Sequence, residues 1–356
     1  VPGTEQVTAE VVNGQDIVLS IDIDMQQKLE EALALRVEEV QGSGGSAMLM
    51  DSATGEIYAC SSSPTFDITD LTKIEEGATN LSSISSSYEP GSTMKAVTML
   101  AALEEGIVNP DTEYFCPAAL KVDDYTITDS HERGDETMSA TTIIADSSNV
   151  GVSLIARDMG FEKLYEYIQK YQLTETTGVD YPGEAQGYVS PRDQWSEVQG
   201  YNISFGQGLT TTPIEMIRFY AALANNGTAT QPHFLLDVPT EEEDRTYATS
   251  QITDNQSAID QLETMMQATV DRGTGTDAQI EGYRVVGKTG TAEIASDQGG
   301  YQQGVYNISF VGYLPDSTTN LVCFVGAYDV PGERQTVEAF HDIMTFAIDR
   351  YNITQN

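Results

Sequence analysis

The sequence contains few of the residues from which metal sites and disulfide frameworks are built. Its 356 residues include only three Cys and three His, which lie far apart along the chain. The cysteines form no Cys-x-x-Cys pair and the histidines no His-Glu-x-x-His motif, so neither a disulfide framework nor a zinc site is predicted. We expect no metal or other cofactor, and we expect His131 on a polar surface.

Basic residues are also scarce. Lys and Arg total 17 against 55 Asp and Glu, which gives a formal net charge of −38. Nucleic acids and anionic lipid headgroups would repel such a chain, so nucleic-acid binding is excluded as a function class. The charged run Glu241–Asp244 is expected to be a solvated loop.

Long apolar runs are missing as well. No stretch reaches the roughly 18 consecutive apolar residues that a membrane span needs. The first residues do not read as a signal peptide, so we expect a soluble fragment or an excised ectodomain. The hydrophobic content of 40% is nevertheless sufficient for a substantial core.

The apolar pattern changes its period twice along the chain. Helical spacing follows a predicted cap at Asp24, and a hairpin signal surrounds the turn near Gly55. The expected helices are 25–40, 92–105, 141–159, 161–171, 213–225, 257–270 and 337–350. The expected strands are 47–50, 57–60, 283–292, 306–314 and 321–328.

Strands near both ends therefore flank a long helical insertion. We predict an α/β fold in which one antiparallel five-stranded sheet is covered by the N- and C-terminal helices. Residues 1–91 and 281–356 would form the sheet part, and residues 92–280 the mainly helical part.

The first candidate for chemistry is Ser92-Thr93-Met94-Lys95, just after a Pro-Gly turn. Residues three apart share a helix face, so Ser92 and Lys95 can touch. A neutral lysine can take the proton that makes a serine nucleophilic, and a helix N-terminus offers N–H groups to an oxyanion. Alone, however, the pattern fits a helix-capping serine with a surface lysine better.

Two further motifs change that balance. Ser147-Ser148-Asn149 interrupts a helical pattern, and Lys288-Thr289-Gly290 lies in a predicted strand. Each of the three motifs occurs once, in the order found in penicillin-binding proteins and class A β-lactamases. The sequence thus resembles the penicillin-recognising serine enzymes. Segments 16–33, 50–66, 88–95, 204–213 and 286–293 extend the resemblance to class B penicillin-binding proteins.

The resemblance implies a peptidoglycan D,D-transpeptidase and assigns a role to each motif residue. Ser92 would attack the penultimate D-alanine of a stem peptide, Lys95 would accept its proton, and Ser147 would relay a proton to the leaving amine. Asn149 would hold the donor amide or Lys95, and Lys288 would be a second positive charge that helps to keep Lys95 neutral. Thr289 would hydrogen-bond the substrate carboxylate, and Gly290 would leave room for the substrate. The backbone N–H groups of Ser92 and Thr291 would form the oxyanion hole.

The resemblance also implies partners and a location. The expected partners are a stem peptide ending in D-Ala-D-Ala, β-lactam antibiotics and a cell-wall synthesis complex. The expected location is the extracytoplasmic face of the bacterial membrane, through an anchor that, like the pedestal domain, this chain lacks. Because the substrate is anionic, we expect a locally cationic cleft against the acidic exterior.

Three other functions stay open. A D,D-carboxypeptidase would use water in place of the amine acceptor, and a penicillin sensor would acylate once and signal. A serine β-lactamase needs an activated water, for which the class A pattern is Glu with Asn four residues later. No Glu between Ser147 and Lys288 meets that pattern, which disfavours class A hydrolysis.

Overall fold

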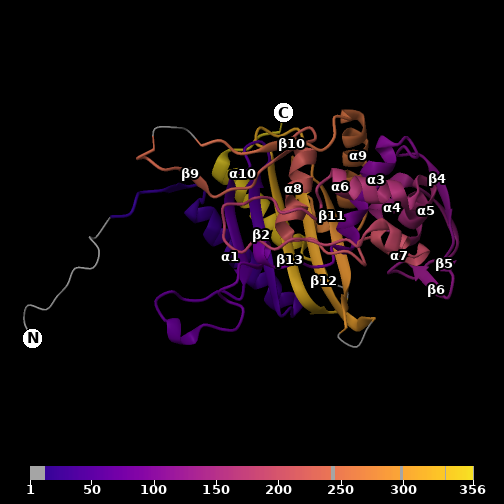
Figure 1. Cartoon of the computed structure of the whole chain (residues 1–356), viewed down its shortest axis with the longest axis horizontal. Helices are drawn as coiled ribbons and strands as arrows, with labels where there is room; N and C mark the ends of the chain where they lie inside the picture. Colours follow the sequence, from indigo (N-terminus) through magenta and orange to yellow (C-terminus); the bar gives the residue numbers. More distant parts are fainter. Residues whose placement is uncertain (1–12, 242–244, 297–299, 333, 356) are drawn as a thin grey trace, which may run out of the picture.

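A five-stranded antiparallel sheet forms the centre of the molecule, with the strand order β11-β12-β13-β2-β3 (Figure 1). The computed structural model describes residues 13–241, 245–296, 300–332 and 334–355, so most of the predicted loop 241–244 and residues 1–12 lie outside the description. The strands are β2 (Gly44–Asp51), β3 (Ile57–Ser63), β11 (Val286–Ala295), β12 (Tyr301–Tyr313) and β13 (Leu321–Pro331). The predicted fold class is confirmed.

A strand from the N-terminal part of the chain pairs with one from the C-terminal part in the middle of this sheet. Strand β13 pairs with β2 from Leu321 opposite Asp51 to Tyr328 opposite Gly44. All eight residues of β2 are buried, because helices cover both faces. The buried apolar residues form two hydrophobic clusters, one on each face of β2. Ala47 and Leu49 belong to one cluster and Met48 and Met50 to the other, because side chains alternate along a strand.

Helices α1 (Ile23–Val40) and α10 (Val337–Tyr351) cover one face of the sheet. Leu29, Leu33 and Val37 recur at helical spacing and are buried there. The predicted cap at Asp24 is wrong by two residues: the Asp22 carboxylate accepts from the backbone N–H groups of Asp24 and Met25, and Asp24 stands in the first turn.

The other face carries α8 (Pro213–Ala224) and, beside β11, the helical part of the chain (Figure 1). The predicted helix 141–159 is divided at its polar triplet into α4 (Ala140–Ala145) and α5 (Asn149–Met159). Other helices there include η2 (Gly91–Thr93), α3 (Met94–Glu104), α6 (Phe161–Lys170), α7 (Glu197–Ser204) and α9 (Gln256–Arg272). No described helix is both long and apolar enough to cross a membrane.

This part also contains short strands that the sequence analysis did not predict. Two antiparallel strand pairs lie between α3 and α4, the second pair enclosed by the first along the chain, and their strands alternate irregularly between exposed and buried residues. The pairs are β4 (Glu113–Cys116) with β7 (Glu136–Ser139), and β5 (Ala119–Val122) with β6 (Tyr125–Thr128). Further pairs join β8 (Thr228–Thr230) to β10 (Thr249–Gln251) and β1 (Val18–Leu19) to β9 (Leu235–Asp237).

Glycines allow η2 to lie tightly between β11 and the loop that follows α7. A Cβ on Gly206 would collide with the Gly91 carbonyl, and a Cβ on Gly91 with the Thr291 carbonyl. Both glycines also have positive φ, of +91° and +53°. The Gly91 N–H donates to the Gly206 carbonyl at 3.0 Å. The position of η2 is thus fixed by backbone contacts that any side chain would prevent.

We predict that Gly206→Ala destabilises the protein by about 2–5 kcal/mol, the sum of a positive-φ cost and overpacking. Gly208→Ala is the matched control, because Gly208 has a φ of +78° but its nearest Cβ neighbour would lie at 3.8 Å. The control should lose only about 1–2 kcal/mol. Urea unfolding of the two variants measures the difference, and equal losses would contradict the packing argument.

Candidate active site

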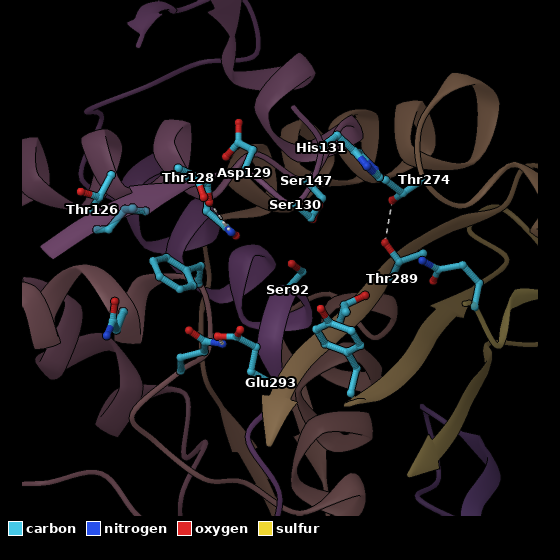
Figure 2. Close-up of a pocket in the computed structure, with 18 residues that line it drawn as sticks. Ser92, Thr126, Thr128, Asp129, Ser130, His131, Ser147, Thr274, Thr289 and Glu293 are labelled. Atoms are coloured by element: carbon cyan, nitrogen blue, oxygen red, sulfur yellow. Dashed lines mark hydrogen bonds between the residues drawn. The ribbon is translucent and has the colours of Figure 1, made fainter. Parts of the chain in front are cut away.

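The three sequence motifs converge on one cavity of about 430 Å³ beside β11. Ser92 comes from η2, Ser147 and Asn149 from the junction of α4 and α5, and Thr289 and Thr291 from β11. Figure 2 shows the Ser92 hydroxyl near the centre of the cavity, with Ser147 on one side and Glu293 on the other. Segments distant in sequence therefore line a single site.

Lys95 lies beneath this cavity and is fully buried in α3. Its Nζ donates to the Ser147 carbonyl, to Ser147 Oγ at 3.1 Å and to Asn149 Oδ1 at 2.7 Å. Ser92 lies in the short 3₁₀ turn directly before α3, one turn from the lysine. Lys95 thus reaches the second motif from the helix that begins next to Ser92.

Lys288, on β11, approaches the Ser147 hydroxyl from the sheet. Its Nζ donates to Ser147 Oγ at 3.0 Å, to the Thr289 carbonyl at 3.2 Å and to Thr289 Oγ1 at 3.3 Å. Ser147 has a φ of +60°, which a non-glycine residue seldom adopts. This conformation directs both the carbonyl and the hydroxyl of Ser147 toward amines, so one residue joins the two lysines.

Burial controls the charge of both amines. Loss of water lowers the pKa of Lys95 to about 7, while the negative charge of Asp129 opposes that fall. Burial also holds the pKa of Lys288 well below its usual range, and the charge of Lys95 adds to the effect. Desolvation is thus the largest cause for both lysines, whereas the family resemblance implied that the charge of Lys288 helps to keep Lys95 neutral.

Strand β11 is an edge strand, so one side of its backbone faces the cavity. The Thr291 carbonyl points toward Gly91, and in a strand the N–H of the same residue points to the same edge. Thr289 Oγ1 lies 2.6 Å from Thr274 Oγ1 across the cavity wall (Figure 2). Both threonines of β11 therefore present polar groups to a ligand.

The structure gives a different reason for a glycine at position 290 from the one expected. We expected its missing side chain to leave room for the substrate. A Cβ at this position would instead meet Ser309 Oγ, Thr93 Cγ2 at 3.0 Å and the Pro90 carbonyl at 3.1 Å. Gly290 therefore permits the close contact between β11 and the turn that carries Ser92.

The walls of the cavity add residues that motif analysis did not find. Asp129, Glu293 and Thr274 line it, as does His131, which is exposed as expected for a polar surface. Asp129 directly follows β6, a four-residue strand too short to give a clear periodic signal. The lining therefore carries carboxylates while the two lysines lie buried beneath it, and the predicted cationic cleft stays a prediction.

No group of three potential metal ligands occurs among the described residues. Cys60, Cys116 and Cys323 are buried and free. The cavity itself presents the hydroxyls of Ser92 and Ser147, and the two amines of lowered basicity hydrogen-bond to Ser147.

Comparison with known proteins adds independent evidence. The family model described as "Penicillin binding protein transpeptidase domain" matches residues 45–345 of this chain. Penicillin-binding protein PbpB of Mycolicibacterium smegmatis is 32% identical, over 99% of this chain and 57% of that protein. Peptidoglycan D,D-transpeptidase FtsI of Escherichia coli is 28% identical, over 80% of this chain and 47% of its own length. The chain thus spans about half the length of these curated relatives.

A solved structure extends the similarity to three dimensions. Penicillin binding protein 3 of Mycobacterium tuberculosis, crystallised with aztreonam, superposes with a TM-score of 0.90 at 29% identity, over 98% of this chain and 82% of that one. Fold, cavity and sequence agree: the chain belongs to the penicillin-binding protein transpeptidase family, in the class B group that its motifs predicted.

Proposed function

We propose that this domain is a serine D,D-transpeptidase that crosslinks peptidoglycan stem peptides through an acyl-enzyme on Ser92. The observation that carries the proposal is the pair of buried lysines that share the Ser147 hydroxyl beside Ser92. A base with a pKa near neutrality is what activation of a serine hydroxyl requires.

Acylation begins at the carbonyl of the penultimate D-alanine. Ser92 Oγ bonds to this carbon while neutral Lys95 takes the hydroxyl proton. The backbone N–H groups of Ser92 and Thr291 stabilise the oxyanion that forms. The orientation of the Thr291 backbone toward the cavity supports this assignment.

Collapse of this intermediate breaks the peptide C–N bond and releases D-alanine. Its amine receives the proton that Lys95 took, with Ser147 as the relay, because Ser147 Oγ is within hydrogen-bond distance of both lysines. Lys288 attracts the terminal carboxylate of the donor, and the Thr289 hydroxyl donates a hydrogen bond to it. Asn149 holds the donor amide or Lys95. The bond from Lys95 to Asn149 Oδ1 supports the second of these roles.

The second half-reaction uses an amine from another stem peptide. The amine attacks the ester carbonyl, a new amide bond forms, and Ser92 regains its proton. Lys95 is again the base that takes a proton from the attacking nitrogen.

The proposed site of action follows from the substrate. Peptidoglycan lies outside the cytoplasmic membrane, so the domain acts on the extracytoplasmic face. We propose that a longer native protein anchors it there and that it works within a cell-wall synthesis complex. Penicillin binding protein 3 of Mycobacterium tuberculosis has been crystallised with aztreonam and with ampicillin, which supports the expectation that β-lactams acylate this domain too.

Benzylpenicillin should give one covalent adduct on Ser92, because the β-lactam amide takes the place of the D-Ala-D-Ala bond. Mass spectrometry of the intact protein and of its peptides locates the adduct. Ser92→Ala should abolish it, whereas exposed Ser87→Ala should not. A label on another serine contradicts the proposal, and rapid loss of the label indicates a β-lactamase.

The acylation rate should rise with pH through about 7, the pKa of Lys95. Lysine is a base only when neutral, and its lowered pKa means that the neutral form is lost as the pH falls below 7. The acylation rate should therefore fall about tenfold for each pH unit below the pKa of Lys95. Rates of labelling by a fluorescent penicillin between pH 5 and 9 measure this, and a flat profile would contradict Lys95 as the base.

Product analysis should distinguish a transpeptidase from its alternatives. With a donor ending in D-Ala-D-Ala, the crosslinked amide should increase with the concentration of an amine acceptor. Ser92→Ala should lower its formation by about 10⁴-fold or more. Hydrolysed donor alone at every acceptor concentration would identify a carboxypeptidase, and acylation without either product a sensor.

A further inference from the structure

Asp129, which none of the three motifs includes, contacts the second motif from outside. Its Oδ2 accepts from Ser148 Oγ at 2.8 Å, and its Oδ1 accepts from the Val150 N–H at 2.9 Å. Ser148 is the N-cap of α5 and Val150 lies in its first turn, so both donors are next to Ser147 and Asn149. One carboxylate thus spans the segment whose oxygens accept from Lys95.

The preceding residue adds a third contact. The Thr128 carbonyl accepts from Asn149 Nδ2 at 3.0 Å (Figure 2). This bond fixes which end of the amide faces inward, so that Asn149 Oδ1 faces Lys95. The end of β6 therefore orients the acceptor oxygens beneath the cavity.

Arg133 holds this carboxylate in place. Its Nε donates to Asp129 Oδ2 at 2.6 Å, and its Nη1 donates to the Cys116 carbonyl at 2.9 Å. The two side chains are only 15% and 10% exposed for Arg133 and Asp129, so solvent screens their interaction weakly. The arginine ties Asp129 to the end of β4 and partly neutralises it.

We propose that Asp129 and Arg133 form a positioning pair that sets both the geometry of the Ser147–Asn149 segment and the protonation of Lys95. The inference rests on the proposed function. It extends the reacting machinery to the two strand pairs between α3 and α4. Neither residue is placed in contact with the reacting atoms, so both act through Ser148, Val150 and the field at Lys95.

The charges around Lys95 give the direction of the effect. Burial lowers the pKa of Lys95 and the charge of Asp129 favours its ammonium form, while the charge of Lys95 in turn helps to lower the pKa of Lys288 on β11. The outer charges are Arg133 and Glu136 next to Asp129, and Asp146, directly after α4, with Arg272 at the end of α9. Removal of the Asp129 charge should therefore make Lys95 neutral at lower pH, and removal of the Arg133 charge should have the opposite effect.

Three variants test the pair by their acylation rate and its pH profile. Asp129→Asn should slow acylation roughly 10–100-fold, the cost of a misplaced segment, and should move the profile to lower pH. Arg133→Gln should move the profile to higher pH. Ser148→Ala removes one contact but keeps the charge, so it should lower the rate without moving the profile.

Asp135→Asn is the matched control, because Asp135 lies in the same region but accepts from the Ala118 N–H at 2.8 Å. Urea unfolding first establishes that each variant folds. The proposal is overturned if folded Asp129→Asn keeps the wild-type rate and profile. It is equally overturned if Asp135→Asn moves the profile as far, since a general charge effect would then suffice.

An NMR titration of the Lys95 side chain in unreacted, ¹⁵N-lysine-labelled protein separates this proposal from the function. Asp129→Asn should lower the midpoint of Lys95 even if no substrate reacts. If wild-type protein forms no penicillin adduct, the proposed function fails while the titration still tests the pair. An unchanged midpoint in both charge variants contradicts the pair itself.

Discussion

Two lysine amines buried side by side are the constraint on which the rest of this structure depends. An ammonium without water is costly, and two of them in contact are more so. The fold meets this cost by lowering the basicity of both amines and by giving them oxygens from Ser147, Asn149 and Thr289. The same desolvation that endangers stability provides a base near neutral pH.

Such an arrangement requires that a helix, a junction of two helices and a strand be held within bonding distance. The strand is an edge of the sheet, so its free backbone groups face the cavity. The turn before α3 lies against that strand because Gly91 and Gly290 carry no side chains. Rigid elements therefore position every group at the site, and small residues set the spacing.

The sequence predicted the sheet, its covering helices and the position of each motif, because these depend on apolar periodicity and on short patterns. It placed Ser147 correctly at a break in a helical run. It did not predict the strands between residues 113 and 139, since strands of four residues with irregular burial give no clear period. It assigned Gly290 to the substrate because only coordinates show which neighbour a missing side chain faces.

The pairing of β2 with β13 has a consequence for the order of folding. About 270 residues separate Asp51 from its partner Leu321, so the inner edge of the β2–β3 hairpin has no partner until those residues have been made. At roughly 5–20 residues per second, that interval lasts on the order of tens of seconds. During it an apolar strand edge stays open to aggregation, and a chaperone that covers this edge would protect the nascent domain until the last strands arrive.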